Sequence, residues 1–346
     1  MDLYPKLSVI MPAYNAERYI ERSVRSILEQ SYRELELIVV DDGSSDQTGS
    51  ILDRMAREDG RLKPLHVANG GPAKARSLGL RAISAHDGYV MFADADDELL
   101  PDALSYAVEG AQGADLVFFG FTIINAGGDR RDYFEPEQLI DSSSIGEAFP
   151  RLYKANLFNQ VWGKLFKAQL LKDGPDFPDY RWGEDRIFIF RCLKKADSLK
   201  ILPECKYNYI IHPGESLISR FYDKKPQVCL EADREVQELC RRFSVDAQGE
   251  AVCRYMFAKS IFSCMTNLFS GSCPLDRKGK RSYVASIIGD PAVKGRCERV
   301  FGGAVPSLLC ALVRSGNVSI NMAAFRMIAT AGRLSPRLFT KLKHKK

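Results

Sequence analysis

Short apolar runs alternate with amphipathic segments through the first 125 residues of this 346-residue chain. Between the runs, apolar residues recur every three or four positions, as at Ile20, Val24 and Ile27, which predicts helices. We expect Asn15 to cap the first helix. Repeated strand–helix units predict an α/β fold with a doubly wound, mostly parallel sheet flanked by helices. The expected strands are 7–11, 34–40, 61–67, 89–93 and 115–124.

The pattern becomes wholly helical from about residue 226. We therefore expect two domains: an α/β domain over residues 1–222 and a helical C-terminal region over 223–346. Lys224, Lys225 and Pro226 would form the joint between them.

Charge is distributed unevenly along the chain. Residues 299–346 contain nine Lys or Arg and no Asp or Glu; because the whole chain carries +5, residues 1–298 carry −4. Nucleic-acid enzymes usually spread basic surface over the body, so we expect no nucleic-acid partner. The basic tail also has apolar stretches over 304–346, which suit an anionic membrane surface. These stretches form a C-terminal apolar stripe. The alternatives to membrane binding are that this stripe packs within the chain or forms a homo-oligomer interface.

The cysteines and the hydropathy of the chain indicate in which cellular compartment the protein is found. All nine cysteines lie at or after Cys192 without C-x-x-C spacing, which favours free thiols in a reducing compartment. No apolar run reaches the ~18 residues of a spanning helix, and the first residues lack a signal-peptide pattern. We expect a cytoplasmic protein, either in solution or peripheral on the inner face of the plasma membrane.

Motifs with polar residues follow three of the predicted strands where each strand ends. These are Pro12-Ala13-Tyr14-Asn15, Asp41-Asp42-Gly43-Ser44-Ser45-Asp46 and Asp94-Ala95-Asp96-Asp97. Each motif alone has an ordinary explanation as a turn or a helix entry. Ligands of open parallel sheets bind at the carboxyl ends of strands, so their location at one edge favours a site. Asp94 and Asp96 suit Mg²⁺ or Mn²⁺ together with phosphate oxygens.

An ordered set of longer motifs carries a family resemblance. SVIMPAYNAERYIERSVRSILEQSY, ELELIVVDDGSSDQT, GGPAKARSLGL and VMFADADDELLPDAL occur in this order, followed by QVWGKLFKAQLL, RWGEDRIFIFRCLKKA and YNYIIHPGESLISR. Over residues 6–222 the chain resembles inverting family-2 glycosyltransferases of the GT-A fold, as found among bacterial capsule, lipooligosaccharide and exopolysaccharide enzymes. The resemblance implies a nucleotide-sugar half at about 1–125 and an acceptor half at about 126–222.

The resemblance also implies roles for individual residues. Asp185 would be the general base, with Glu184 beside it, and Asp96 would bind the metal with Asp94 and His212. Alternatives stay open for three residues: His212 as a turn histidine, Arg220 as an exposed arginine and Trp162 as core. The residues implied to bind the nucleotide sugar are Pro12, Ala13, Tyr14, Asp42, Arg76, Asp94, Ala95, Trp162 and Arg220.

The implied reaction is metal-dependent transfer of a hexose or N-acetylhexosamine from a UDP-sugar to a hydroxyl of a glycan or lipid-linked saccharide. Mn²⁺ or Mg²⁺ would be the cofactor. Lys74, Ser77 and Gly163 depart from the family pattern and leave the donor sugar unassigned. A non-catalytic sugar-nucleotide-binding or scaffold protein is the alternative. A haloacid-dehalogenase-type phosphatase fits poorly, because Asp97-Glu98 stands where Gly-Thr would follow.

Overall fold

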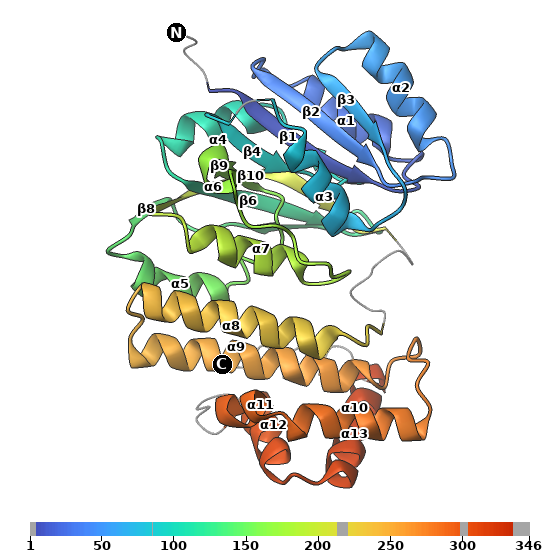
Figure 1. Ribbon diagram of the computed structural model, residues 1–346, viewed down its shortest axis with the longest axis vertical. Helices are drawn as coiled ribbons and strands as arrows, with labels where there is room; N and C mark the ends of the chain where they lie inside the picture. Colours follow the sequence, from blue (N-terminus) through green and yellow to red (C-terminus); the bar gives the residue numbers. More distant parts are fainter. Residues whose placement is uncertain (1–4, 85, 213–220, 298–303, 335–346) are drawn as a thin grey trace. The chain divides into compact units, whose positions relative to one another are not determined.

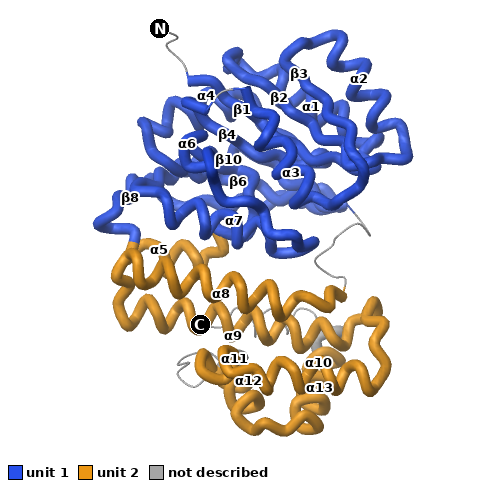
Figure 2. Tube along the Cα trace, in the orientation of Figure 1, with its two compact units in different colours: residues 1–145, 158–215 blue, residues 146–157, 216–346 orange. Residues whose placement is uncertain are grey.

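The computed structural model describes residues 5–84, 86–212, 221–297 and 304–334 (Figure 1). The chain forms two compact units (Figure 2). Unit 1 comprises Met1–Ile145 and Phe158–Glu215, and unit 2 comprises Gly146–Leu157 and Ser216–Lys346. The domain division at residue 222 stays a prediction.

Unit 1 is built on a mixed ten-stranded sheet. Its main path runs β3-β2-β1-β4-β9-β6-β10-β5, while β7 pairs with β6 and β8 pairs with β10. The strands are β1 (Leu7–Ala13), β2 (Leu35–Asp41), β3 (Leu62–His66), β4 (Tyr89–Phe92), β5 (Glu98–Leu99), β6 (Leu116–Ile124), β7 (Arg130–Tyr133), β8 (Gln138–Asp141), β9 (Lys164–Lys167) and β10 (Ser198–Ile210). The helices are α1 (Ile20–Leu28), α2 (Thr48–Glu58), α3 (Pro72–Arg81), α4 (Ala103–Ala111), α6 (Ala168–Leu171) and α7 (Glu184–Leu193).

The parallel half of the sheet matches the sequence prediction. Strands β3, β2, β1 and β4 lie side by side in parallel, and each has bounds within two residues of the predicted range. Strand β10 also runs parallel to β6. Strand β9, which the sequence analysis did not predict, runs antiparallel between β4 and β6. The predicted α/β fold with a mostly parallel sheet is confirmed.

Helices cover both faces of this sheet (Figure 1). Residues of α1, α2 and α4 form one core with alternate residues of β1, including Val9 and Met11. On the opposite face, a Cβ added to Gly79 of α3 would lie 2.4 Å from Cγ2 of Ile10, so only glycine allows this approach. Phe188 of α7 meets Phe92 edge-on on that face, with ring centroids 5.6 Å apart.

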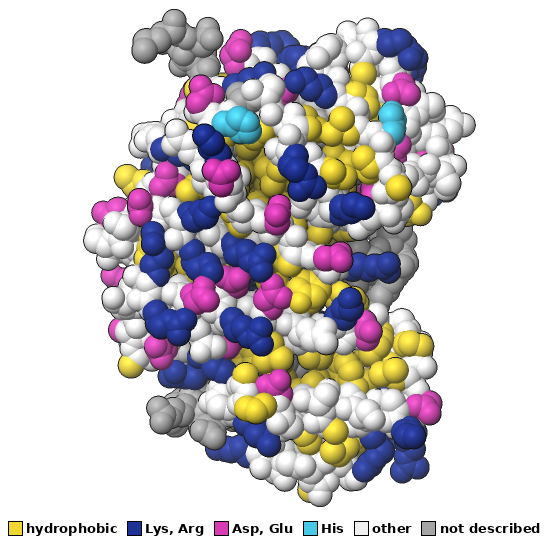
Figure 3. Space-filling view, in the orientation of Figure 1, with side chains coloured by type: hydrophobic (Ala, Val, Ile, Leu, Met, Phe, Trp, Pro, Cys, Tyr) yellow, Lys and Arg dark blue, Asp and Glu magenta, His cyan; other side chains and the backbone are white. Residues whose placement is uncertain are grey.

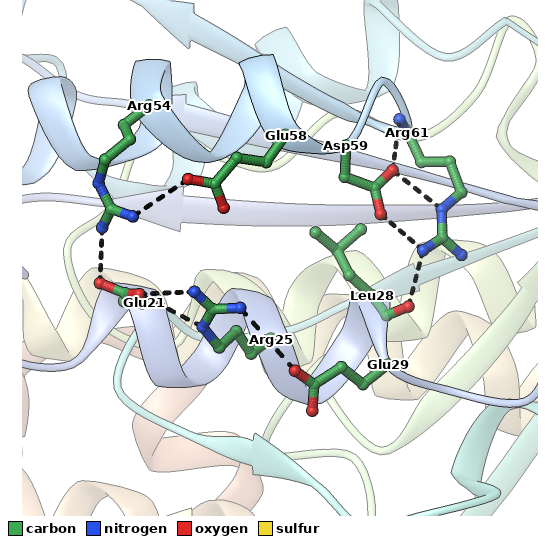
Figure 4. Close-up of polar contacts among 8 residues, drawn as sticks. All are labelled: Glu21, Arg25, Leu28, Glu29, Arg54, Glu58, Asp59 and Arg61. Atoms are coloured by element: carbon green, nitrogen blue, oxygen red, sulfur yellow. Dashed lines mark hydrogen bonds and ion pairs between the residues drawn. The ribbon is translucent and has the colours of Figure 1, made fainter.

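The surface of unit 1 has mixed charge. On its visible face, Lys and Arg side chains are interspersed with Asp and Glu (Figure 3). One network joins α1 and α2, where Arg54 and Arg25 bind the two carboxylate oxygens of Glu21 at 2.7 and 2.8 Å (Figure 4). Arg61 pairs with Asp59 just before β3. Asp59 and Arg61 thus lie at the amino end of β3, away from the strand-end motifs. Exposed ion pairs of this kind contribute little to stability.

Unit 2 is helical, as the sequence predicts. Helices α8 and α9 pack together, as do α10 with α13 and α11 with α12 (Figure 1). In the part of the chain described above, no helix is both long and apolar enough to cross a membrane. The helices are α5 (Ile145–Lys154), α8 (Lys225–Arg242), α9 (Ala247–Asn267), α10 (Arg277–Gly289), α11 (Pro291–Cys297), α12 (Ala304–Arg314) and α13 (Val318–Leu334).

Part of the C-terminal apolar stripe packs inside unit 2. Phe325 of α13 is fully buried and meets Phe262 of α9 edge-on, with ring centroids 5.4 Å apart. Leu308, Ile320 and Met327 remain exposed on α12 and α13. Internal packing therefore accounts for some of the apolar residues of this stripe, while the basic residues after 334 lie outside the described part of the chain.

The predicted role of Asn15 as a helix cap is wrong. Helix α1 begins at Ile20, and Asn15 instead adopts the left-handed region at φ 49°. Its side-chain oxygen accepts a hydrogen bond from the backbone N–H of Ser45 at 2.9 Å. Asn15 thus joins the loop after β1 to the loop after β2.

Candidate active site

The strand-end motifs meet at the carboxyl edge of the parallel strands. Ala13 of β1 pairs with Asp41 of β2, and Ile10 of β1 pairs with Phe92 of β4. Pro12-Ala13-Tyr14, Asp42 and the loop that begins at Asp94 therefore leave the sheet side by side. Tyr14 is exposed, whereas Ala13 is buried.

Asp42 organises a glycine turn at the start of α3. Its two carboxylate oxygens accept the backbone N–H groups of Gly70 and Gly71, each at 2.7 Å. Gly71 has φ 88°, which glycine adopts without strain. Because each carboxylate oxygen has two lone pairs, Asp42 retains acceptor capacity for a further donor.

Arg76 of α3 lies between three carboxylates. Its Nη1 donates to Oε1 of Glu184 at 3.1 Å and to Oδ1 of Asp185 at 2.9 Å, and its Nη2 donates to Oδ1 of Asp94 at 3.0 Å. The Arg76 side chain is only 6% exposed. One guanidinium thus links the loop after β4 to the first turn of α7.

Burial shifts the titration of this cluster. Burial, together with repulsion from Asp185, raises the pKa of Glu184 to about 7, although Arg76 opposes the shift. Burial also raises the pKa of Asp185, against the attraction of Arg76. The Arg76 pKa is raised despite its burial, because Asp185, Asp94 and Glu184 favour the cation. A carboxylate with a raised pKa is a stronger base, which suits proton abstraction near neutral pH.

Asp97 anchors the acidic loop, a role that the sequence analysis missed. Its carboxylate accepts from the Tyr207 hydroxyl and from the backbone N–H of Ile210, both at 2.8 Å. The same hydroxyl accepts the backbone N–H of Asp94 at 3.1 Å. On the other side, the Ser23 hydroxyl donates to the carbonyl of Ala95 at 2.8 Å. The loop that carries Asp94 and Asp96 is therefore fixed between β10 and α1.

His212 lies just beyond β10, two residues after the N–H that Asp97 accepts. Its ring stacks on Tyr19 with centroids 4.0 Å apart. Its Nε2 is buried and has no hydrogen-bond partner among the residues that the structure describes.

Trp162 is 6% exposed and stacks on Tyr207 and Tyr209 at 4.7 and 5.2 Å between ring centroids. It belongs to the core of unit 1, so a sugar contact through its small exposed surface stays a prediction. Arg220 lies outside the described residues.

The comparisons with known proteins agree with this geometry. Residues 8–174 match the model of the family described as Glycosyl transferase family 2. The chain carries a family 2 glycosyltransferase domain. Among curated proteins, it is 30% identical over 218 residues to the uncharacterized glycosyltransferase EpsJ of Bacillus subtilis, covering 61% of this chain and 63% of EpsJ.

Two further relatives extend the comparison. Over 171 residues the chain is 34% identical to the Campylobacter jejuni GalNAc(5)-diNAcBac-PP-undecaprenol beta-1,3-glucosyltransferase, covering 49% of this chain and 54% of that enzyme. The chain thus spans less than two thirds of either curated relative. The structure of S. aureus TarS 1–349 in complex with UDP-GlcNAc is similar at 22% identity and a TM-score of 0.68, covering 94% of this chain and 92% of that one. This likeness supports the GT-A fold.

The charge balance of the glycosyltransferase domain's candidate site fits a divalent cation. Asp94, Glu184 and Asp185 surround the buried cation of Arg76, and Asp96 adds a carboxylate in the same loop as Asp94. Buried Lys164 carries only part of a positive charge at neutral pH, because burial lowers its pKa to about 7 against the attraction of Asp185. Within the described ranges, no three His, Cys, Asp or Glu side chains already converge as a metal cluster.

Carboxylate oxygens suit Mg²⁺ or Mn²⁺, and the unpartnered Nε2 of His212 adds a nitrogen donor.

Proposed function

We propose that this chain transfers a hexose or N-acetylhexosamine from a UDP-sugar to a hydroxyl of a glycan or lipid-linked saccharide, with inversion at the anomeric carbon. The observation that carries the proposal is the carboxylate cluster around Arg76, at the carboxyl edge of a family 2 domain. The relatives support the substrate classes: one TarS structure holds UDP-GlcNAc, and the Campylobacter enzyme is named for a glycan on diphosphoundecaprenol. Both are named as beta transferases.

Asp185 is the proposed general base. Its Oδ1 accepts from Arg76 and its Oδ2 accepts the backbone N–H of Val161 at 3.3 Å, so the carboxylate is held in one orientation. In the reaction, this carboxylate takes the proton of the acceptor hydroxyl as that oxygen bonds to the anomeric carbon. The bond from the sugar to the diphosphate breaks in the same displacement. One displacement on an α-linked donor gives a β-linked product.

Arg76 and Glu184 are the proposed positioning residues. The guanidinium fixes Asp185 in the first turn of α7 relative to Asp94 after β4, and Glu184 shares the same Nη1. A base held at a fixed distance from the donor site needs no reorganisation at the moment of reaction. Arg76 thus acts on the reaction through Asp185, in addition to the nucleotide contact implied by the resemblance.

The proposed donor site follows the strand ends. Pro12, Ala13 and Tyr14 lie along the nucleoside, and Asp42 accepts from the uracil base. Ala95 and Arg220 complete the contacts expected with the diphosphate sugar. Bound Mn²⁺ or Mg²⁺, held by Asp96 with Asp94 and His212, would offset the negative charge of the departing UDP.

The first prediction concerns donor binding. Asp96→Ala should abolish Mn²⁺-dependent binding of UDP, because the proposed ligand carboxylate is removed while the fold of the loop rests on Asp97. Titration calorimetry with UDP, with and without Mn²⁺, measures this directly. Glu58→Ala on α2, in the network at the opposite edge of the sheet, is the matched control and should bind UDP like wild type. Unchanged UDP affinity in Asp96→Ala would remove Asp96 from the metal site.

We also propose that residues 304–346 attach the protein to the inner, anionic face of the plasma membrane, the membrane that would carry a lipid-linked acceptor. Exposed Leu308, Ile320 and Met327 supply apolar contact, and each basic residue near an anionic surface adds about 1 kcal/mol. The alternatives are a fully cytoplasmic protein and a homo-oligomer that uses the same surface.

Co-sedimentation with anionic and neutral vesicles tests this attachment. The full chain should bind anionic vesicles more strongly, and a truncation after Arg299 should lose that preference. Binding that is absent, or that survives truncation, would leave these helices to packing or oligomerisation. Light scattering measures the molar mass of the full chain and of the truncated chain. It thereby distinguishes internal packing from oligomerisation.

A further inference from the structure

Two pairs of thiols face each other across helices α8 and α9. Sγ of Cys229 lies 3.7 Å from Sγ of Cys264, and Sγ of Cys240 lies 3.8 Å from Sγ of Cys253. From Cys229 to Cys240 the chain advances by the same number of residues as from Cys253 to Cys264. Both pairs therefore obey one antiparallel register, three turns apart along the helices.

We propose that these pairs are a modification site, at which a low-molecular-weight disulfide such as oxidised glutathione converts both thiol pairs into disulfides that join α8 to α9. The four cysteines are buried, each no more than 7% exposed. A disulfide bond is about 2.05 Å long, so each pair has to close by less than 2 Å. Helix packing already holds the sulfur atoms at this range, and small side-chain rotations complete the approach.

The chemistry proceeds by two thiol–disulfide exchanges. Cys240 is the first attacking group, because it is the most exposed of the four and its hydrogen bond with Cys253 lowers its pKa. The Cys240 thiolate bonds to one sulfur of oxidised glutathione and releases one glutathione thiolate. Cys253 then gives its proton to solvent, and its sulfur displaces the second glutathione. Two protein thiols and one oxidised glutathione thus yield one protein disulfide and two reduced glutathiones.

Cys297 of α11 and Cys310 of α12 also form a hydrogen-bonded thiol pair. The two pairs of α8 and α9 differ from it because they repeat in one register along the same two helices. Cys192 of α7 is equally buried, but it makes no hydrogen bond to another thiol within the described part of unit 1, and burial raises its pKa well above the usual value. It is therefore expected to stay reduced. The four cysteines of α8 and α9 lie in unit 2, outside the residues that we propose for sugar transfer. The inference is independent of that function.

The test is disulfide mapping on the folded, full-length chain. The protein is incubated with oxidised glutathione, remaining thiols are alkylated, and tryptic peptides are analysed without reduction. The four cysteines fall in four different tryptic peptides, but Cys273 shares a peptide with Cys264. Fragment ions of that peptide identify which of the two cysteines is linked. We expect Cys229–Cys264 and Cys240–Cys253 cross-links, a Cys192 thiol that remains free, and a thermal unfolding midpoint that rises and returns after reduction.

Serine variants provide the matched controls. Cys229→Ser should lose only its own cross-link and keep Cys240–Cys253, and Cys240→Ser should do the converse. Chain unfolded in urea in the same buffer shows that the oxidant is active. Absence of both cross-links in the folded chain, or preferential linkage of other cysteines, would overturn the proposal.

Discussion

Asp185→Asn should lower the turnover number for sugar transfer by about 100- to 10,000-fold, the range that a positioned general base contributes. Asn keeps the shape, and its one carbonyl oxygen can still accept from Arg76, while its NH₂ group takes the place of the oxygen that accepts from Val161. The amide cannot take the acceptor proton. Because a base acts only in the transition state, UDP affinity should change little. Initial rates at saturating donor, together with calorimetry of UDP, separate these two effects.

Glu184→Gln is the comparison for this experiment. It lies next to Asp185 on the same turn of α7 and bonds to the same Nη1 of Arg76, yet it has no proposed proton-transfer role. We expect a much smaller loss of turnover. If Glu184→Gln is inactive and Asp185→Asn retains full activity, the base is Glu184. Equal loss of UDP affinity in both variants would contradict the division of roles.

Arg76→Met should destabilise unit 1 by about 3–5 kcal/mol, because removal of one partner leaves buried charges uncompensated. Met keeps much of the side-chain volume but leaves Asp94, Glu184 and Asp185 facing one another. Turnover should also fall steeply, since the orientation of Asp185 depends on the guanidinium. Denaturant unfolding of unit 1, followed beside the activity assay, measures both effects. Arg81→Met, at the exposed end of the same helix, is the control and should change stability by less than about 0.5 kcal/mol.

The loss of stability in Arg76→Met should depend on pH. Burial raises the pKa values of Glu184 and Asp185, that of Glu184 to about 7, and loss of Arg76 raises them further. As the pH falls, these carboxyls therefore take up protons at a higher pH in the folded variant than in wild type, and their mutual repulsion decreases. The stability difference from wild type should shrink as the pH falls from 8 to 5. A difference that is constant over this range would show that the three carboxylates are not the cause.

The sequence predicts the parallel half of the fold because each of its strands is a local signal. The runs at 7–11 and 89–93 are apolar and end at polar loops, and β1 and β4 follow them closely. Strand β9 has only four residues, Lys164–Lys167, and its place between β4 and β6 depends on pairing with residues far away in the chain. A short segment carries too little periodicity for that prediction.

The site residues likewise fall into two groups, those that a local sequence pattern predicts and those that only the folded structure brings together. Asp94 and Asp96 lie at a strand end and could be found from local pattern and chemistry. The ion pair of Arg76 with Glu184 joins residues 108 positions apart, and no local pattern indicates it. The Asp97–Tyr207 bond likewise needs the β5–β10 pairing. The facing cysteines become visible only once the register of α8 against α9 is known.

A donor screen tests the central proposal most directly. Full-length protein is incubated with a panel of UDP-, GDP- and ADP-sugars, with and without Mn²⁺, and release of the nucleoside diphosphate is measured for wild type and Asp185→Asn. We predict Mn²⁺-dependent release of UDP from at least one UDP-sugar by wild type, increased by saccharide acceptors and lost in Asp185→Asn. Failure to bind, hydrolyse or transfer from any nucleotide sugar would contradict the proposed activity. Binding of UDP without any turnover would instead identify a non-catalytic sugar-nucleotide-binding protein.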